Sequence, residues 1–210
     1  ELGGCVAAVL PIHYPRALLA AFDILPVEVW GPPGVDASQG AAHVQSYVCS
    51  VVRNALSFLL TGGLDAVDLI LVPHACDSLQ GLGSLLLDLV RPHQPVLPLY
   101  LPRGRRECDV HYLADEIRAL YARLAAIVGH PPSPADLLAS IRADEAADEL
   151  LAELHRHRGE LGLSTLDFYR LVRSREYLPV DRFCALARAA LNERGGAAPR
   201  GVPIILSGIV

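Results

Sequence analysis

The sequence contains no lysine and no methionine, and all 18 of its basic residues are arginine. The lack of lysine excludes a Walker-A phosphate loop, a Schiff-base lysine for pyridoxal phosphate and a lysine general base. No apolar run approaches 18 residues, and no charged-then-apolar leader opens the chain. We therefore expect neither a membrane-spanning helix nor a secretory signal, and no membrane partner.

The remaining composition is that of an apolar-rich globular protein. The 210 residues are 52% hydrophobic and 20% charged, which allows one large domain or two small ones with a sizeable core. The net charge is -5, so the chain lacks the basic footprint of a nucleic-acid-binding protein. The one basic cluster, RGRRE at 103–107, is too short to change this expectation.

The cysteines are few, scattered and odd in number. They occupy positions 5, 49, 76, 108 and 184. This distribution favours free thiols in a reducing cytoplasm over a disulfide framework.

Strand-like and helix-like segments alternate along the first part of the chain. Short apolar runs predict strands at 5–10, 27–30, 64–73, 95–102 and 201–210. Helical periodicity predicts helices opening at Pro15 and covering 41–60, 78–92, 108–129, 132–160 and 164–195, with Ser133 and Ser164 as N-caps. The fold class is therefore α/β, a Rossmann-like parallel sheet with flanking helices plus a helical block.

The same pattern gives a domain prediction. Residues 1–131 form the Rossmann-like domain, 132–200 the helical block, and 201–210 the first strand of a second domain that is cut off here. The absence of an initiator methionine before Glu1 indicates a trimmed N-terminus or a start inside a longer gene. We expect the chain to be the N-terminal part of a two-domain subunit.

Two cysteines are the strongest candidates for chemistry. Cys76 follows the predicted strand at 64–73, and Cys49 is expected about two turns into the helix at 41–60. Ligands of parallel sheets collect at the carboxyl ends of strands, where two thiolates suit zinc, copper(I) or an iron–sulfur cluster. Neither cysteine belongs to a CxxC pair, and simple burial in the core is the alternative.

The segments around these cysteines resemble a known family. QSYVCSVVRNAL (45–56) and LDAVDLILVPHACDSLQGL (64–82) are similar to the D-component family of 2-hydroxyacyl-CoA dehydratases, which includes benzoyl-CoA reductase subunits and double-cubane cluster proteins. LPIHYPRALLAAFDILPVEVWGPPG (10–34) looks like the opening of that family, and the later helices and Ser207-Gly208 extend the likeness over most of the chain.

The resemblance implies a specific cofactor. Such subunits hold a [4Fe-4S] cluster by three cysteine thiolates between two Rossmann-like domains, with one iron open to substrate. Cys49 and Cys76 match the first two ligands, and the third is expected beyond residue 210. The implied partners are an acyl-CoA substrate, a homologous second subunit and an ATP-hydrolysing iron–sulfur activator.

The implied activity is ketyl-radical elimination of water from an acyl-CoA thioester, or its reduction. A low-potential electron on the thioester carbonyl would expel the hydroxyl group and acidify the β-proton. The family commonly has an arginine soon after the Cys-Asp pair, whereas this chain has Gln80, which cannot orient an anion by charge. The alternatives are a non-catalytic partner or scaffold subunit and a double-cubane-type reductase of small molecules.

The other cysteines carry weaker expectations. Cys108 is either a third ligand from within the chain or an incidental loop thiol. Cys184 and Cys5 are expected in the core.

Several polar motifs have a structural reading beside a functional one. His74 forms an H-x-C pair with Cys76, but a solvent-facing loop histidine is the commoner case. His155 and His157 are expected on a solvated helix face, and Asp77 as a helix N-cap. GLGS (81–84) lacks the third glycine of a dinucleotide fingerprint and indicates close packing of a helix.

Overall fold

A computed structural model describes residues 4–32 and 34–195 and divides the chain into two compact units. The sheet unit comprises the chain up to Asp144 together with Glu176–Leu178, and the helical unit comprises Glu145–Arg175 and the chain from Pro179. None of the helices in the described ranges is long and apolar enough to cross a membrane.

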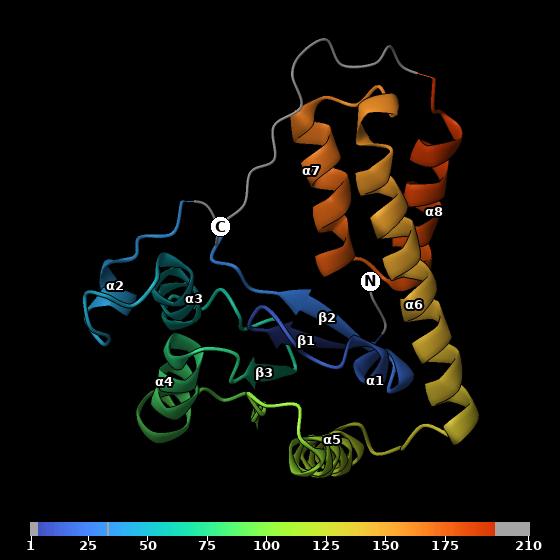
Figure 1. The fold of residues 1–210 in the computed structure, drawn as a ribbon. Helices are drawn as coiled ribbons and strands as arrows, with labels where there is room; N and C mark the ends of the chain where they lie inside the picture. Colours follow the sequence, from blue (N-terminus) through green and yellow to red (C-terminus); the bar gives the residue numbers. More distant parts are fainter. Residues whose placement is uncertain (1–3, 33, 196–210) are drawn as a thin grey trace. The chain divides into compact units, whose positions relative to one another are not determined.

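The sheet unit is built on a four-stranded parallel sheet (Figure 1). Its strands, in the order β2-β1-β3-β4, are β1 (Cys5–Val9), β2 (Ile24–Glu28), β3 (Leu69–Pro73) and β4 (Val96–Leu99). All three pairings are parallel, and Val9 lies opposite both Glu28 and Leu71. The carboxyl ends of the four strands therefore meet at one edge of the sheet.

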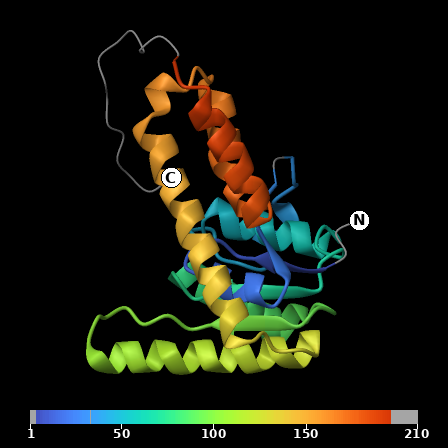
Figure 2. The ribbon, with the colours of Figure 1, turned by 90° about the vertical axis from the view of Figure 1, so that its right-hand side faces the viewer.

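Helices cover both faces of this sheet, as Figure 1 and Figure 2 show. On one face α3 (Ser50–Leu60) and α4 (Asp77–Leu85) pack on Ala8, Ile70 and Val72. On the other face α1 (Arg16–Ala21) and α5 (Glu107–Val128) pack on the alternate residues of the same strands. Every residue of β3 is buried because both of its faces are covered.

The connections after β2 and α4 contain short or irregular helices. A four-residue helix, α2 (Ser38–Ala41), precedes α3. A π-helical turn, η1 (Leu86–Val90), continues α4 and ends at Arg91, which has a φ of 46°. Inside α4, Gly83 lies against β3, because an added Cβ would fall 2.7 Å from His74 Nε2 and 3.5 Å from Val72 Cγ1. This confirms the packing role predicted for the 81–84 motif.

The helical unit has its own core. The unit boundary falls within α6 (Pro134–Arg156), which is followed by the 3₁₀ turn η2 (Arg158–Glu160), α7 (Thr165–Arg173), the 3₁₀ turn η3 (Ser174–Glu176) and α8 (Val180–Asn192). Phe168 and Phe183 are fully buried in its cluster. Both predicted N-cap serines accept a bond from the backbone amide three residues on, Ser164 from Asp167 and Ser133 from Asp136.

The predicted α/β class is confirmed, and several of the predicted element boundaries were wrong. No single helix covers 41–60, because residues 42–49 form turns and α3 begins at Ser50. The second strand covers 24–28 instead of 27–30, and residues 61–66 form turns before β3. The last helical block is broken at Pro179, which is the N-cap of α8. The strand predicted at 201–210 lies outside the described residues.

Candidate functional site

Cys49 occupies the N-cap of α3. The sequence pattern had placed it about two turns inside a helix. Its backbone is extended, with φ -61° and ψ 156°, and its carbonyl oxygen accepts the Arg53 amide. Its side chain makes no capping hydrogen bond and is exposed. The thiol is therefore free to bind an external group, and simple burial, the alternative reading, does not apply.

Cys76 occupies the equivalent position on the neighbouring helix. It is the N-cap of α4, three residues beyond the end of β3, and its backbone is extended, with φ -149° and ψ 168°. Its thiol is also exposed and makes no capping hydrogen bond. Asp77, predicted as the cap, instead begins the first turn, where its Oδ1 accepts a hydrogen bond from Arg103 Nη2 at 2.7 Å.

The two cysteines belong to one edge of one packed layer. Val48 and Leu79, close neighbours of Cys49 and Cys76, lie in the same hydrophobic cluster on the sheet. Val48 and Asp77 also line one cleft of about 460 Å³. Each thiol stands at the positive end of a helix dipole, and the free amides of both first turns favour anionic sulfur ligands.

The arrangement fits part of a metal centre. Soft thiolates are the ligands of iron–sulfur clusters, and both candidate thiols are reduced, exposed and unengaged. Within residues 4–32 and 34–195, no group of three or more His, Cys, Asp or Glu side chains is placed to hold a metal ion. Cys49 and Cys76 are therefore candidate ligands, and the described residues group no third ligand with them.

The remaining cysteines are dispersed. Cys108 is exposed in the first turn of α5, whereas Cys184 is buried in the helical unit, as predicted. Cys5 is half-buried on β1, where burial and the Asp68 carboxylate raise the pKa of its thiol to about 11.

The other polar motifs behave as surface groups. His155 is exposed on α6 and packs edge-on against Phe168, while His157 lies 3.2 Å from the Glu160 carboxylate. Gln80 is exposed on α4, one turn beyond Cys76.

His74 is not the solvent-facing loop residue that the sequence suggested. Both of its ring nitrogens are buried and have no hydrogen-bond partner among the described residues. The ring packs against Tyr100, with centroids 4.4 Å apart, and against Gly83 of α4. Burial lowers the pKa of His74 below its ordinary 6.5, and the Glu116 carboxylate opposes this shift.

This burial predicts an acid-sensitive sheet unit. Because the folded-state pKa is lowered, the unfolded chain binds the proton first, and stability present above pH 6.5 falls as the pH drops towards the folded-state value. The urea midpoint of the wild type should fall as the pH drops from about 7.5 to about 5, and the replacement His74→Phe should reduce this fall. The exposed control His93→Asn should keep the wild-type dependence of the midpoint on pH. Equal slopes in wild type and His74→Phe would contradict this placement.

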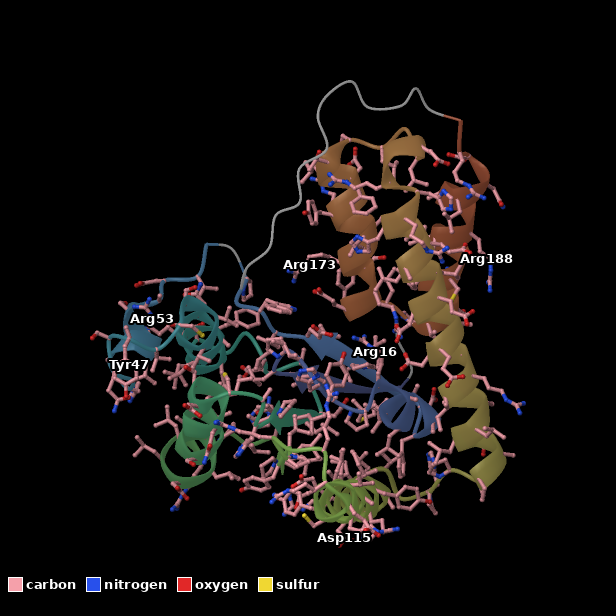
Figure 3. All side chains as sticks on the ribbon, in the orientation of Figure 1. Arg16, Tyr47, Arg53, Asp115, Arg173 and Arg188 are labelled. Atoms are coloured by element: carbon pink, nitrogen blue, oxygen red, sulfur yellow. The ribbon has the colours of Figure 1, made fainter. Side chains whose placement is uncertain are left out.

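A polar cluster at the same edge was missed by sequence reasoning. Glu28 ends β2, and its side chain is only 8% exposed. Its carboxylate accepts hydrogen bonds from Arg16 at 2.7 Å, Trp30 Nε1 at 2.9 Å and Tyr14 at 3.0 Å. Arg16, labelled in Figure 3, also lies over the Tyr14 ring. The cluster joins the loops that follow β1 and β2.

The fold and the site define a class of protein. It has an α/β unit with a parallel sheet, and the carboxyl edge of that sheet presents free thiols at two helix N-termini. Residues 11–210 match the family described as 2-hydroxyglutaryl-CoA dehydratase, D-component. The chain belongs to this family.

Curated relatives agree with that membership. The chain is 29% identical over 181 residues to a benzoyl-CoA reductase subunit of Thauera aromatica, covering 84% of this chain and 46% of the relative. It is 24% identical over 209 residues to the beta subunit of (R)-2-hydroxyglutaryl-CoA dehydratase of Acidaminococcus fermentans, covering 96% and 55%. The beta subunit of lactoyl-CoA dehydratase of Anaerotignum propionicum is 21% identical over 196 residues, covering 92% and 51%. The chain therefore spans about half the length of these relatives.

Proposed function

We propose that this chain is the cluster-binding part of an iron–sulfur subunit in a 2-hydroxyacyl-CoA dehydratase-like or acyl-CoA-reducing enzyme. In this proposal Cys49 and Cys76 are two thiolate ligands of a [4Fe-4S] cluster. The observation that carries it is that both thiols are free and exposed at the N-caps of α3 and α4, two helices whose buried residues share one hydrophobic cluster on the sheet. Family membership supports the same assignment.

The site needs ligands from outside the described residues. We expect a third cysteine in sequence beyond residue 210, because the relatives are about twice as long and no third ligand group lies near in the described part. The division into a cluster-binding domain at 1–131, a helical block at 132–200 and the start of a second domain at 201–210 belongs to this proposal. A homologous second subunit is the proposed partner, since each of these relatives is itself named as one subunit of its enzyme.

The residues of this chain would position and stabilise the centre. The first-turn amides of α3 and α4 would donate to the cysteine sulfurs and offset their negative charge. The exposed ion pair between Arg103 and Asp77 links the loop after β4 to the first turn of α4, next to Cys76. When bound, such a cluster supplies a low-potential electron and an iron that polarises a thioester carbonyl.

The electron source is proposed to be a separate protein. This chain has no lysine and hence no Walker-A phosphate loop, so ATP hydrolysis would belong to an iron–sulfur activator. One electron on the thioester carbonyl would let the hydroxyl group leave and would acidify the β-proton. The proposed setting is the cytoplasm, where thiols stay reduced.

The test is anaerobic purification of the complete gene product, followed by iron and acid-labile sulfide determination. We expect a brown protein with about four irons and about four sulfides per polypeptide, as one cubane cluster requires. A folded, colourless protein that remains free of iron after reconstitution would contradict the proposal and would favour the alternative of a scaffold subunit.

A further inference from the structure

Arg53 carries an isolated positive charge in the segment that contains Cys49. Between Asp36 and Asp65 the sequence has no aspartate, glutamate or lysine and no other arginine. Arg53 lies on α3, one turn after Cys49, and its backbone amide donates to the Cys49 carbonyl oxygen at 3.2 Å. The segment around this arginine therefore supplies no acid to pair with it.

The Arg53 side chain finds no partner elsewhere in the described part of the chain. The residue is partly buried, its Nε is shielded from solvent, and this nitrogen makes no hydrogen bond. No ion pair or aromatic contact of Arg53 exists among the described residues either. Buried donors nearly always have a partner, and an exception indicates a group that binds from outside. Arg53 is therefore available to an anion that the described residues do not contain.

The other arginines that are not exposed have acidic partners. Among the described residues these are Arg16 and Arg175. Arg16 binds the Glu28 carboxylate at 2.7 Å, and Arg175 lies 3.4 Å from the Asp148 carboxylate. Removing a charge from water without a counter-charge is costly, and both of these arginines meet that requirement within the chain. Arg53 differs from them in this respect.

The helix sets the direction of the Arg53 side chain. Side chains of a helix lean toward its N-terminus, over the residue one turn earlier, which for Arg53 is the N-cap Cys49. This turn is held by close packing of α2, because a Cβ added to Gly40 would clash with the Arg53 carbonyl oxygen. Figure 3 shows Arg53 on the side of α3 that carries α2. The free charge and the free thiol thus belong to one face of a packed helix.

We propose that Arg53 is the counter-charge of the centre that Cys49 binds, and that it raises the reduction potential of this centre. The assignment rests on the proposed function and adds a positioning residue to it. A cubane core held by thiolates is an anion, and it becomes more negative when it accepts one electron from its donor protein. A nearby cation stabilises the reduced state more than the oxidised state. No bond forms or breaks at Arg53 in this step.

The first experiment measures the charge beside Cys49 in iron-free protein. The complete gene product is alkylated at low ionic strength with anionic iodoacetate or neutral iodoacetamide, and the ratio of the two rates is determined for each cysteine by mass spectrometry. Arg53→Gln should lower this ratio at Cys49 by about 3-fold, because the anionic reagent loses an attracting charge. Arg53→Lys should keep the ratio, and Cys108 on α5 is the internal control. An unchanged ratio at Cys49 in Arg53→Gln would overturn the inference.

The second experiment measures the reduction potential of the reconstituted complete gene product by a dye-mediated titration followed by electron paramagnetic resonance. Arg53→Gln should lower the ratio of reduced to oxidised cluster at a fixed potential by about 10-fold, which is about 59 mV for one electron. Arg53→Lys should restore most of this loss, because it keeps the positive charge. Arg123→Gln, at an exposed position on α5, is the matched control and should titrate like wild type. A wild-type potential in Arg53→Gln would overturn the inference.

A structural role and a failure of the proposed function give different results. Arg53→Gln should not lower the urea midpoint of the iron-free protein, because it removes a buried donor that has no partner. A lower midpoint with an unchanged potential would identify a purely structural residue and overturn the inference. A full cluster whose potential ignores Arg53 overturns this inference alone, whereas a wild type that binds no iron after reconstitution overturns the proposed function and the counter-charge together.

Discussion

Replacement of Cys49 or Cys76 by serine is expected to abolish the retention of iron and sulfide by the complete gene product. A serine hydroxyl stays protonated where a cysteine thiolate binds iron, and a site held by few protein ligands tolerates the loss of none of them. Each single variant should lose most of the visible absorbance and of the bound iron after anaerobic reconstitution. Secondary structure should be unchanged, because both side chains are exposed and make no capping bond.

The matched control is Cys108→Ser, which removes another exposed thiol in the first turn of a helix. It should keep the wild-type iron, sulfide and absorbance. Loss of iron in the Cys108 variant, with retention in both others, would identify a different ligand set and contradict the assignment.

Replacement Glu28→Gln is expected to lower the free energy of unfolding of the sheet unit by about 2–4 kcal/mol. The carboxylate is nearly buried and accepts from three donors, one of them a guanidinium whose side chain is 19% exposed. A glutamine amide keeps the shape of the carboxylate, but it cannot accept hydrogen bonds from all three donors and cannot balance the positive charge of the guanidinium. Urea denaturation followed by Trp30 fluorescence measures this directly, because Trp30 is the single tryptophan and binds Glu28.

A double-mutant cycle with Arg16→Leu isolates the ion pair from the rest of the cluster. We expect a coupling energy of at least about 1 kcal/mol between Glu28 and Arg16. Glu149→Gln, at an exposed position on α6, should change stability by less than about 0.5 kcal/mol. Additive effects of the Glu28 and Arg16 replacements would show that the contact contributes little.

The sheet could be predicted because its signals are local. The run LILVP is apolar at every position, as a strand covered on both faces requires, and it forms β3 as expected. Strands separated by helix-length segments predict parallel pairing, which places every strand end at one edge. That rule alone put Cys76 at the carboxyl edge of the sheet.

The start of α3 could not be read from the same kind of signal. Val44 and Val48 continue the apolar spacing of the helix backward, yet they pack on the core from turns. Periodicity records which side chains face the core and does not record the backbone that brings them there. The consequence is large for Cys49, which moves from a helix interior to an exposed N-cap with free first-turn amides below it.

Two tertiary features had no sequence signal at all. Glu28 lies 12 residues from Arg16 on another element, and only the parallel alignment of β1 and β2 brings the loops around them together. His74 is buried because Gly83 of α4 lets the helix approach its ring. Both depend on how neighbouring elements pack, which residue spacing along the chain does not specify.

The most direct test of the central claim is a thiol-protection measurement on unmodified protein. The complete gene product is alkylated anaerobically with and without bound iron, and each cysteine is quantified by mass spectrometry. Cys49 and Cys76 should be protected together while iron is bound and should become reactive after chelation, with Cys108 reactive throughout. Rapid alkylation of Cys49 and Cys76 in protein that retains its full iron content would contradict the account.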